Sequence, residues 1–96
     1  MMLVVAYDVD TTDSAGARRL RKVARLCERY GIRVQNSVFE VLLDSSQLVA
    51  LKAGLEKIIC KDTDSIRIYR LGNTYRNRIE VIGRTGPIET GGPLLL

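Results

Sequence analysis

The sequence predicts a small α+β domain in which a four-stranded antiparallel sheet carries two helices on one face. The chain has 96 residues, which is enough for one hydrophobic core and no second domain. Short runs rich in β-forming residues alternate with two stretches that have helical apolar spacing. Hydrophobic residues make up 46% of the chain and charged residues 27%, as in ordinary folded proteins.

The first half of the chain begins with a predicted strand and a predicted helix. Residues 2–9 form a nearly continuous apolar run that is too short for a helix, and this indicates a central strand. Hydroxyl and carboxylate side chains at 11–14 are typical helix caps, and apolar residues recur at helical spacing over 17–30. Gly31 is expected to end this helix in a left-handed conformation.

The remaining elements follow from alternation and capping patterns. Residues 32–43 predict one long strand with a bulge or bend near 36–37, where the apolar phase changes. An Asp-x-x-Gln capping box at 44–47 opens a second helix. Residues 65–71 and 76–82 alternate apolar and polar side chains and predict two further strands.

We assign the domain the order β-α-β-β-α-β of a ferredoxin-like sandwich, with the first and third strands in the middle of the sheet, although the ranges above place one strand between the helices and two after them. Such a domain would occupy residues 1–84, and residues 85–96 would form a C-terminal tail for dimerisation or docking. The open face of the sheet needs a cover, so we expect a homodimer, either face to face or with exchanged tails. A frayed tail is the alternative.

Charge and residue types limit the possible functions. Fifteen Lys and Arg against eleven Asp and Glu give a net charge of +4, which favours a polyanionic partner such as RNA or DNA. Basic residues crowd the segment 18–29, although a solvated helix surface is the alternative interpretation. The chain has no histidine, which excludes Ser-His and Cys-His nucleophiles. Cys27 and Cys60 lack metal-ligand spacing and no signal segment is visible, so we expect a cytoplasmic protein without a membrane partner.

Asp8 is the candidate catalytic and metal-binding residue. It ends the first predicted strand, where a side chain can emerge at the rim of the sheet. Magnesium prefers oxygen ligands and often binds one or two carboxylates, so two copies of Asp8 related by a twofold axis would form a paired site. Such an ion would promote in-line phosphodiester displacement. The alternative is an aspartate that caps the next loop, and this is stronger for Asp10 and Asp13.

Several arginines could bind the nucleic-acid backbone. Arg18 and Arg19 in the first turns of the helix, and Arg33 in the next strand, could hold phosphates against the metal. Phe39 is more typical of a core residue than of a base-stacking one. Further positive charge is expected toward the other end of the domain, at Arg67, Arg70, Arg76 and Arg78.

Four stretches, at 6–9, 18–24, 30–40 and 64–69, together resemble a known family. They are similar to the small CRISPR-associated protein of spacer acquisition, the second of the two adaptation proteins and an endoribonuclease by designation. The most specific stretch is the Gly-x-Arg-Val-Gln-x-Ser-Val-Phe-Glu run. The resemblance covers residues 1 to about 84.

The resemblance implies a ferredoxin-like homodimer in which Asp8 binds magnesium at the dimer interface. It also implies functional arginines at Arg18 or Arg19 and at Arg33, with Phe39 as a further nucleic-acid contact. The first two arginines are not distinguished at this point.

The resemblance leaves the activity open. Some family members resemble metal-dependent RNases, others DNases, and others serve as a structural bridge between two dimers of the CRISPR adaptation integrase. A toxin-type messenger RNA interferase on the same fold is a third possibility, whereas a metal-carrier domain fits poorly because Cys-x-x-Cys is missing. In many members the tail pairs with the partner subunit, as residues 87–90 could here, and residues 94–96 could dock on the integrase.

Overall fold

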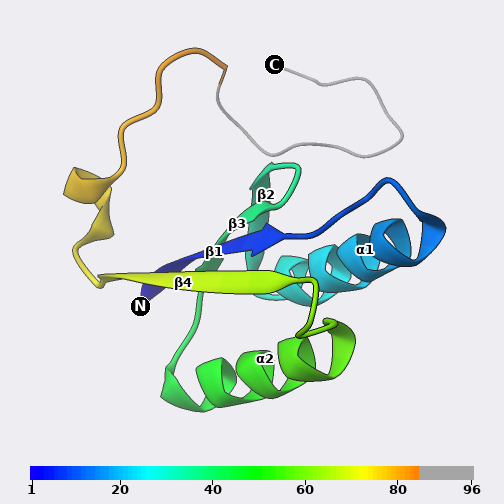
Figure 1. Ribbon diagram of the computed structural model, residues 1–96. Coiled ribbons are helices and arrows are strands. Elements are labelled where there is room, and N and C mark those ends of the chain that lie inside the picture. The colour runs from blue at the N-terminus through cyan, green and yellow to red at the C-terminus, as the bar shows by residue number, and fades with distance from the viewer. Residues whose placement is uncertain (85–96) are drawn as a thin grey trace.

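Residues 1–84 are described by the computed structural model, in which two helices lie on one face of a sheet (Figure 1). In chain order the elements are β1 (Met2–Asp8), α1 (Ser14–Glu28), β2 (Gly31–Gln35), β3 (Val38–Leu42), α2 (Ser45–Ile58), β4 (Ser65–Gly72) and the 3-10 helix η1 (Tyr75–Arg78). The four strands are antiparallel in the spatial order β2-β3-β1-β4. The predicted ferredoxin-like order, with the first and third strands central, is therefore confirmed.

The core lies between the sheet and the helices because the strands alternate their side chains. Leu3, Val5 and Tyr7 of β1 point toward the helices and are at most 3% exposed. Phe39 and Val41 of β3 stand beside them, fully buried. The helices contribute the apolar stripes Leu20, Val23, Ala24, Cys27, Leu48, Leu51 and Leu55. The other side chains of β1 lie on the sheet face that neither α1 nor α2 covers.

The capping box that predicted the start of α2 is confirmed. The Asp44 side chain accepts a hydrogen bond from the backbone N–H of Gln47 at 2.8 Å, and the Asp44 backbone N–H donates to Gln47 Oε1 at 2.9 Å. These reciprocal bonds satisfy two donors that the first turn of a helix leaves unpaired.

Residues 32–43 form two strands and not the single long strand that the apolar pattern predicts. β2 and β3 pair as a hairpin, and the chain reverses at Asn36 and Ser37, where a bend was expected. Arg33 braces this turn, because its Nε donates to the Asn36 carbonyl oxygen at 2.7 Å and its Nη2 to Asn36 Oδ1 at 3.2 Å. The change of apolar phase marks a reversal of chain direction because alternation restarts after a turn.

Gly31 does not have the left-handed conformation that the sequence predicts. The C-cap of α1 is Arg29 in a right-handed conformation, and the positive-φ glycines of residues 1–84 are Gly72 and Gly83. Gly31 instead opens β2, where an added Cβ would lie 1.9 Å from the Glu40 backbone oxygen of β3. Glycine is required there because the two strands approach closely.

The predicted strand at 76–82 is wrong. Residues 75–78 form η1, and residues 79–82 have no strand partner among the 84 residues that the structure describes. β4 is an edge strand that pairs with β1, and Gly72, with φ of +79°, turns the chain away from the other edge of β4. Residues 79–82 line a hollow together with Ile32, Val38 and Glu40 of β2 and β3, on the sheet face that the helices leave open. Alternation alone does not predict a strand, because a strand also needs an edge to pair with.

The predictions for the tail lie outside the described residues. These are the boundary of a dimerisation or docking segment at 85–96, the pairing of 87–90 and the docking of 94–96. Within residues 1–84, neither helix has the length and apolar character required to cross a bilayer.

Candidate active site

Asp8 ends β1 on the uncovered face of the sheet, where its side chain is exposed. It pairs in register with Ser65, the first residue of β4. A shallow hollow of about 360 Å³ surrounds it, lined by Ala6, Tyr7, Asp8, Ser37, Ser65 and Arg67. The predicted position of Asp8 at the rim of the sheet is therefore confirmed.

Arg67 lines the same hollow, although the sequence suggested that it lies toward the other end of the domain. β4 runs antiparallel to β1, so the start of β4 lies beside the end of β1, and Arg67 stands opposite Ala6. The Tyr69 side chain and the negative charge of Asp8 raise the pKa of Arg67. Sequence spacing misses this neighbour because the pairing of β1 with β4 joins residues about sixty positions apart.

The other acidic residues near β1 serve the backbone. Asp10 Oδ1 accepts hydrogen bonds from the backbone N–H and the hydroxyl of Thr12, at 2.9 and 2.7 Å, and these bonds lower the pKa of Asp10. Asp13 Oδ1 caps α1 by accepting from the backbone N–H of Gly16 at 2.7 Å. The capping interpretation of Asp10 and Asp13 is confirmed, which leaves Asp8 as the candidate metal ligand of this segment.

The donor set at Asp8 fits a hard cation such as magnesium. An exposed carboxylate with neighbouring serine hydroxyls offers oxygen ligands, and magnesium keeps several waters when it binds to few carboxylates. Within the described part of the chain, His, Cys, Asp and Glu nowhere gather in groups of three or more that could hold a metal. Asp8 is therefore the carboxylate that one chain offers at this hollow.

Arg18 and Arg19 have different surroundings, which the sequence alone does not reveal. Arg18 is exposed on α1. The guanidinium of Arg19 forms an ion pair with Asp64, in which Nε donates to Oδ2 at 2.8 Å and Nη2 donates to Oδ1 at 3.2 Å. The hypothesis of phosphate binding thus suits Arg18 better, because two donors of Arg19 already have a carboxylate partner.

Asp64 is the centre of a buried polar network that the sequence analysis missed. Its side chain has no exposed surface and also accepts hydrogen bonds from the Tyr7 hydroxyl at 2.6 Å, the Cys60 backbone N–H at 3.1 Å and the Thr63 hydroxyl at 3.0 Å. Burial disfavours the charged carboxylate, but the bonds from Arg19 and Tyr7 outweigh it and hold the pKa of Asp64 well below its usual range. Burial, and then the bond to Asp64, raise the pKa of Tyr7 to about 12.

The network fixes the strand ends that border the hollow. Tyr7 directly precedes Asp8, and Asp64 directly precedes Ser65. The backbone N–H of Tyr7 also donates to the Ser37 carbonyl oxygen at 2.9 Å, which ties the β2–β3 turn to the same place. Three segments that are distant in sequence therefore meet rigidly around Asp8.

Arg33 and Phe39 face the helix side of the sheet. Phe39 is 0% exposed and Arg33 is 8% exposed, with the guanidinium carbon 5.8 Å from the centre of the Phe39 ring. The core interpretation of Phe39 is confirmed. The burial of Phe39 argues against a direct contact with nucleic acid, because a base would have to displace core side chains to reach the ring. Arg33 braces the hairpin turn from the same side.

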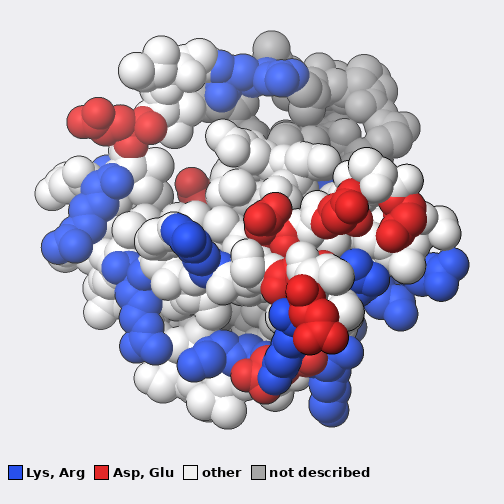
Figure 2. All heavy atoms as spheres, in the orientation of Figure 1, with Lys and Arg blue, Asp and Glu red and all other residues white. Residues whose placement is uncertain are grey.

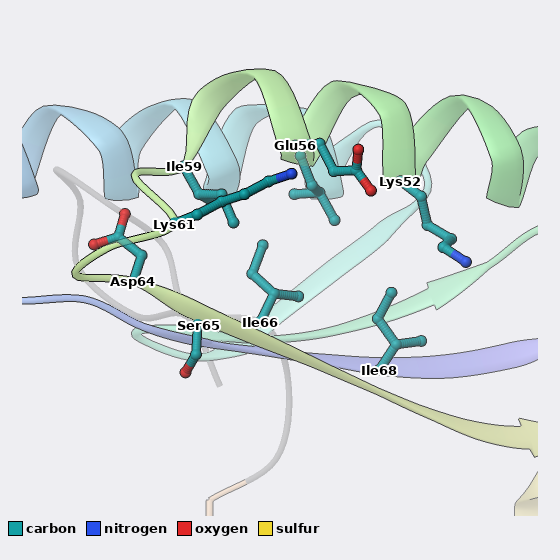
Figure 3. A pocket seen from close by; sticks show the side chains of 9 residues that line it. Lys52, Glu56, Ile59, Lys61, Asp64, Ser65, Ile66 and Ile68 are labelled. Carbon is teal, nitrogen blue, oxygen red and sulfur yellow. The ribbon is translucent and has the colours of Figure 1, made fainter.

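Two other features of the surface are its basic side chains and a groove that borders the Asp8 hollow at Ser65. Basic side chains are spread over the face shown in Figure 2 and do not form one compact patch. A groove of about 400 Å³ runs between α2 and β4 on the helix side, and Ile66 and Ile68 point into it from the strand (Figure 3). Lys52, Glu56 and Lys61 stand at its rim.

Comparison with known proteins identifies the family. Residues 1–79 match the model of the family described as CRISPR associated protein Cas2. The chain is 50% identical over 95 residues to the CRISPR-associated endonuclease Cas2 of Halalkalibacterium halodurans, covering 99% of both proteins. It is also 50% identical over 95 residues to the CRISPR-associated endoribonuclease Cas2 3 of Rhodospirillum rubrum, covering 99% of this chain and 100% of that protein.

A solved structure agrees with these sequence matches. Cas2 of Streptococcus pyogenes, crystallised at pH 6.5, superposes with a TM-score of 0.82 at 51% identity, covering 86% of this chain and 100% of that chain. The family model covers the residues that line the Asp8 hollow, and the chain belongs to the CRISPR associated protein Cas2 family.

Proposed function

We propose that this protein is a CRISPR-associated, metal-dependent endonuclease that cleaves RNA or duplex DNA as a homodimer. The observation that carries the proposal is the exposed Asp8 at the end of β1, in a hollow that it shares with Arg67 and two serines. The relatives named as an endonuclease and an endoribonuclease support phosphodiester hydrolysis as the reaction.

Asp8 and the same residue of a second subunit would hold the metal. Magnesium bound there would lower the pKa of a bound water and stabilise negative charge on the phosphate. The chain itself has no histidine to serve as a general base, so its carboxylates must carry this chemistry. Because each chain would supply one carboxylate, the metal would bind only where two subunits meet, so metal binding would require the dimer.

The uncovered sheet face supports a homodimer. It exposes apolar side chains that a monomer would leave in water: Ile32 is 44% exposed, Leu42 is 49% exposed and Tyr69 is 49% exposed. A second copy of the chain that covers this face would bury them and would approach the side that carries Asp8.

Phosphates of the substrate would bind to the outer surface of α1. Arg18 is exposed there, together with further basic side chains at Arg21, Lys22, Arg25 and Arg29. Arg19 and Arg33 act from within the fold, Arg19 through Asp64 and Arg33 through the hairpin turn. The physiological setting would be spacer acquisition, with the CRISPR adaptation integrase as partner.

A second candidate function is a non-catalytic bridge within the acquisition complex. The observation that favours it is the exposed basic surface of α1, made by Arg18, Arg21, Lys22, Arg25 and Arg29. In this case the basic surface of α1 would bind DNA, and Asp8 would have no chemical role.

Cleavage assays on the Asp8→Asn variant separate the two functions. The purified protein is incubated with single-stranded RNA and with duplex DNA, with magnesium or with EDTA. We expect magnesium-dependent cleavage by the parent and by the control variant Asp62→Asn, because Asp62 is an exposed residue of the turn after α2. Asp8→Asn should cut no faster than the EDTA blank. Cleavage at the parental rate by Asp8→Asn would eliminate the nuclease proposal.

Spacer uptake in cells provides the matching test of the bridge. The bridge function predicts that Asp8→Asn leaves uptake intact while Arg18→Glu abolishes it. Light scattering of the purified protein tests the dimer directly, and a monomer at assay concentrations would exclude the paired metal site.

A further inference from the structure

The hollow that contains Asp8 also contains a guanidinium group. Arg67 lies opposite Ala6, and Asp8 lies opposite Ser65, two positions farther along the same strand pair. Both side chains therefore point out of the uncovered face as diagonal neighbours. Diagonal neighbours in an antiparallel pair lie about 7–8 Å apart, which a long side chain can span.

Two hydroxyl groups complete the wall of this hollow. Ser65 is the direct partner of Asp8 in the sheet, and Ser37 comes from the turn between β2 and β3. The turn is held in place because the Tyr7 backbone N–H donates to the Ser37 carbonyl oxygen at 2.9 Å. A guanidinium and two hydroxyls are donors from which phosphate oxygens accept hydrogen bonds.

Charge balance favours a cation beside Asp8 when substrate is bound. If two Asp8 carboxylates held one divalent ion, their charges would balance that of the ion, and the negative charge of a phosphodiester group at the same place would still lack a partner. Arg67 adds one positive charge per subunit at this point. Arginine stays charged in proteins and matches phosphate geometry with its two parallel donors.

We infer that Arg67, with the hydroxyls of Ser37 and Ser65, binds a phosphodiester group of the nucleic-acid strand directly beside Asp8. The role is distinct from that of the basic residues on α1, because it acts on the phosphate nearest the metal. The inference rests on the proposed function in that it takes the substrate to be a nucleic acid. In the simplest opposing view, Arg67 serves only as a counter-ion for Asp8.

Nucleic-acid binding without metal tests this inference. Fluorescence anisotropy with labelled single-stranded RNA and labelled duplex DNA is measured in EDTA over a series of salt concentrations, for the parent, Arg67→Ala, Arg67→Lys and Arg70→Ala. Arg70 is the matched control, because it is an exposed arginine on the same strand that lies opposite Leu3 and hence on the other face. Thermal melting shows that each variant is folded. Arg67→Gln, which keeps most of the side-chain stem, replaces Arg67→Ala if that variant is unstable.

We expect Arg67→Ala to weaken binding about 10-fold or more, the range of a hydrogen bond to a charged group. The magnitude of the slope of log affinity against log salt concentration should fall by about 1 for each phosphate contact that is lost. Arg67→Lys should keep the slope but lose part of the affinity, since lysine lacks the paired donors. Arg70→Ala should match the parent.

Two results would overturn the inference. One is an equal loss in Arg67→Ala and Arg70→Ala, which would reflect net charge alone. The other is unchanged nucleic-acid affinity in Arg67→Ala with tighter magnesium binding in a metal titration, which would identify Arg67 as a counter-ion for Asp8. Neither result depends on cleavage. The proposed nuclease function therefore fails independently, through an Asp8→Asn variant that still cuts.

Discussion

Replacing Asp64 with alanine removes the carboxylate that joins β1, α1 and the start of β4. Its side chain is completely buried and accepts hydrogen bonds from Tyr7, Arg19, Cys60 and Thr63, over distances of 2.6 to 3.2 Å. Substitution by alanine strands a tyrosine hydroxyl in the core and leaves an arginine without its carboxylate. We therefore predict that Asp64→Ala is strongly destabilising.

The magnitude follows from the burial of each partner. Breaking a buried ion pair costs about 3–5 kcal/mol, and the lower part of this range applies because the Arg19 side chain is 22% exposed and can regain water. The Tyr7 hydroxyl, in a residue that is 3% exposed, adds an unsatisfied group that costs about 1–3 kcal/mol. Because part of this cost overlaps with the first, we expect a total of about 4 kcal/mol, which corresponds to a fall of roughly 15–30 °C in Tm for a domain of this size.

Urea unfolding and thermal melting followed by circular dichroism measure this loss. Asp62→Ala is the control, because Asp62 is an exposed residue of the same turn, and surface substitutions usually change stability by no more than about 0.5 kcal/mol. A loss below about 1 kcal/mol for Asp64→Ala, or a loss equal to that of Asp62→Ala, would refute the network as a source of stability.

Three other predictions concern residues of the core and the sheet. Stability should fall as pH rises from about 10 to about 12, because Tyr7 ionises near 10.0 in the unfolded chain while burial and the Asp64 carboxylate raise its pKa in the folded protein to about 12. The stability that Tyr7 contributes in this way is fully present below pH 10 and amounts to about 3 kcal/mol. The fall should be missing from the pH–Tm profile of Tyr7→Phe. Phe39→Ala should lower the free energy of unfolding in urea by about 3–5 kcal/mol, while the folded variant binds nucleic acid as tightly as the parent. A selective loss of binding in fluorescence anisotropy would instead indicate that Phe39 contacts the nucleic acid. Gly31→Ala should destabilise the β2–β3 hairpin, since its Cβ would lie 1.9 Å from the Glu40 backbone oxygen, and a parental Tm for this variant would contradict the observed strand pairing.

Local patterns predict those parts of the fold whose causes are local. The capping box of α2 depends on Asp44 and Gln47, three positions apart, and it forms as expected. The apolar stripe of α1 and the alternation of β1 likewise depend on near neighbours. Residues 76–82 have equally good alternation and form no strand in the described chain, because pairing depends on an edge that the residues themselves do not specify.

The candidate site divides in the same way. Asp8 is predictable because it ends a buried apolar run. Asp64 is not, because its partners Arg19 and Tyr7 lie 45 and 57 positions away. Arg67 was expected elsewhere for the same reason, since its place beside Asp8 follows from the register of β1 and β4. Long-range pairing thus decides which charged residues gather at the site.

The outward position of Asp8 depends on the buried residue that precedes it. A shift of one residue in the register of β1 would turn Asp8 toward the helices and Tyr7 toward solvent. The bond from the Tyr7 hydroxyl to Asp64, on the helix side of the sheet, opposes such a shift, because it fixes Tyr7 inward at 2.6 Å from a buried charge. Loss of Asp64 should therefore lower any activity of Asp8 even at temperatures where the domain is still folded. Parental activity in folded Asp64→Ala would show that the sheet alone holds Asp8 in place.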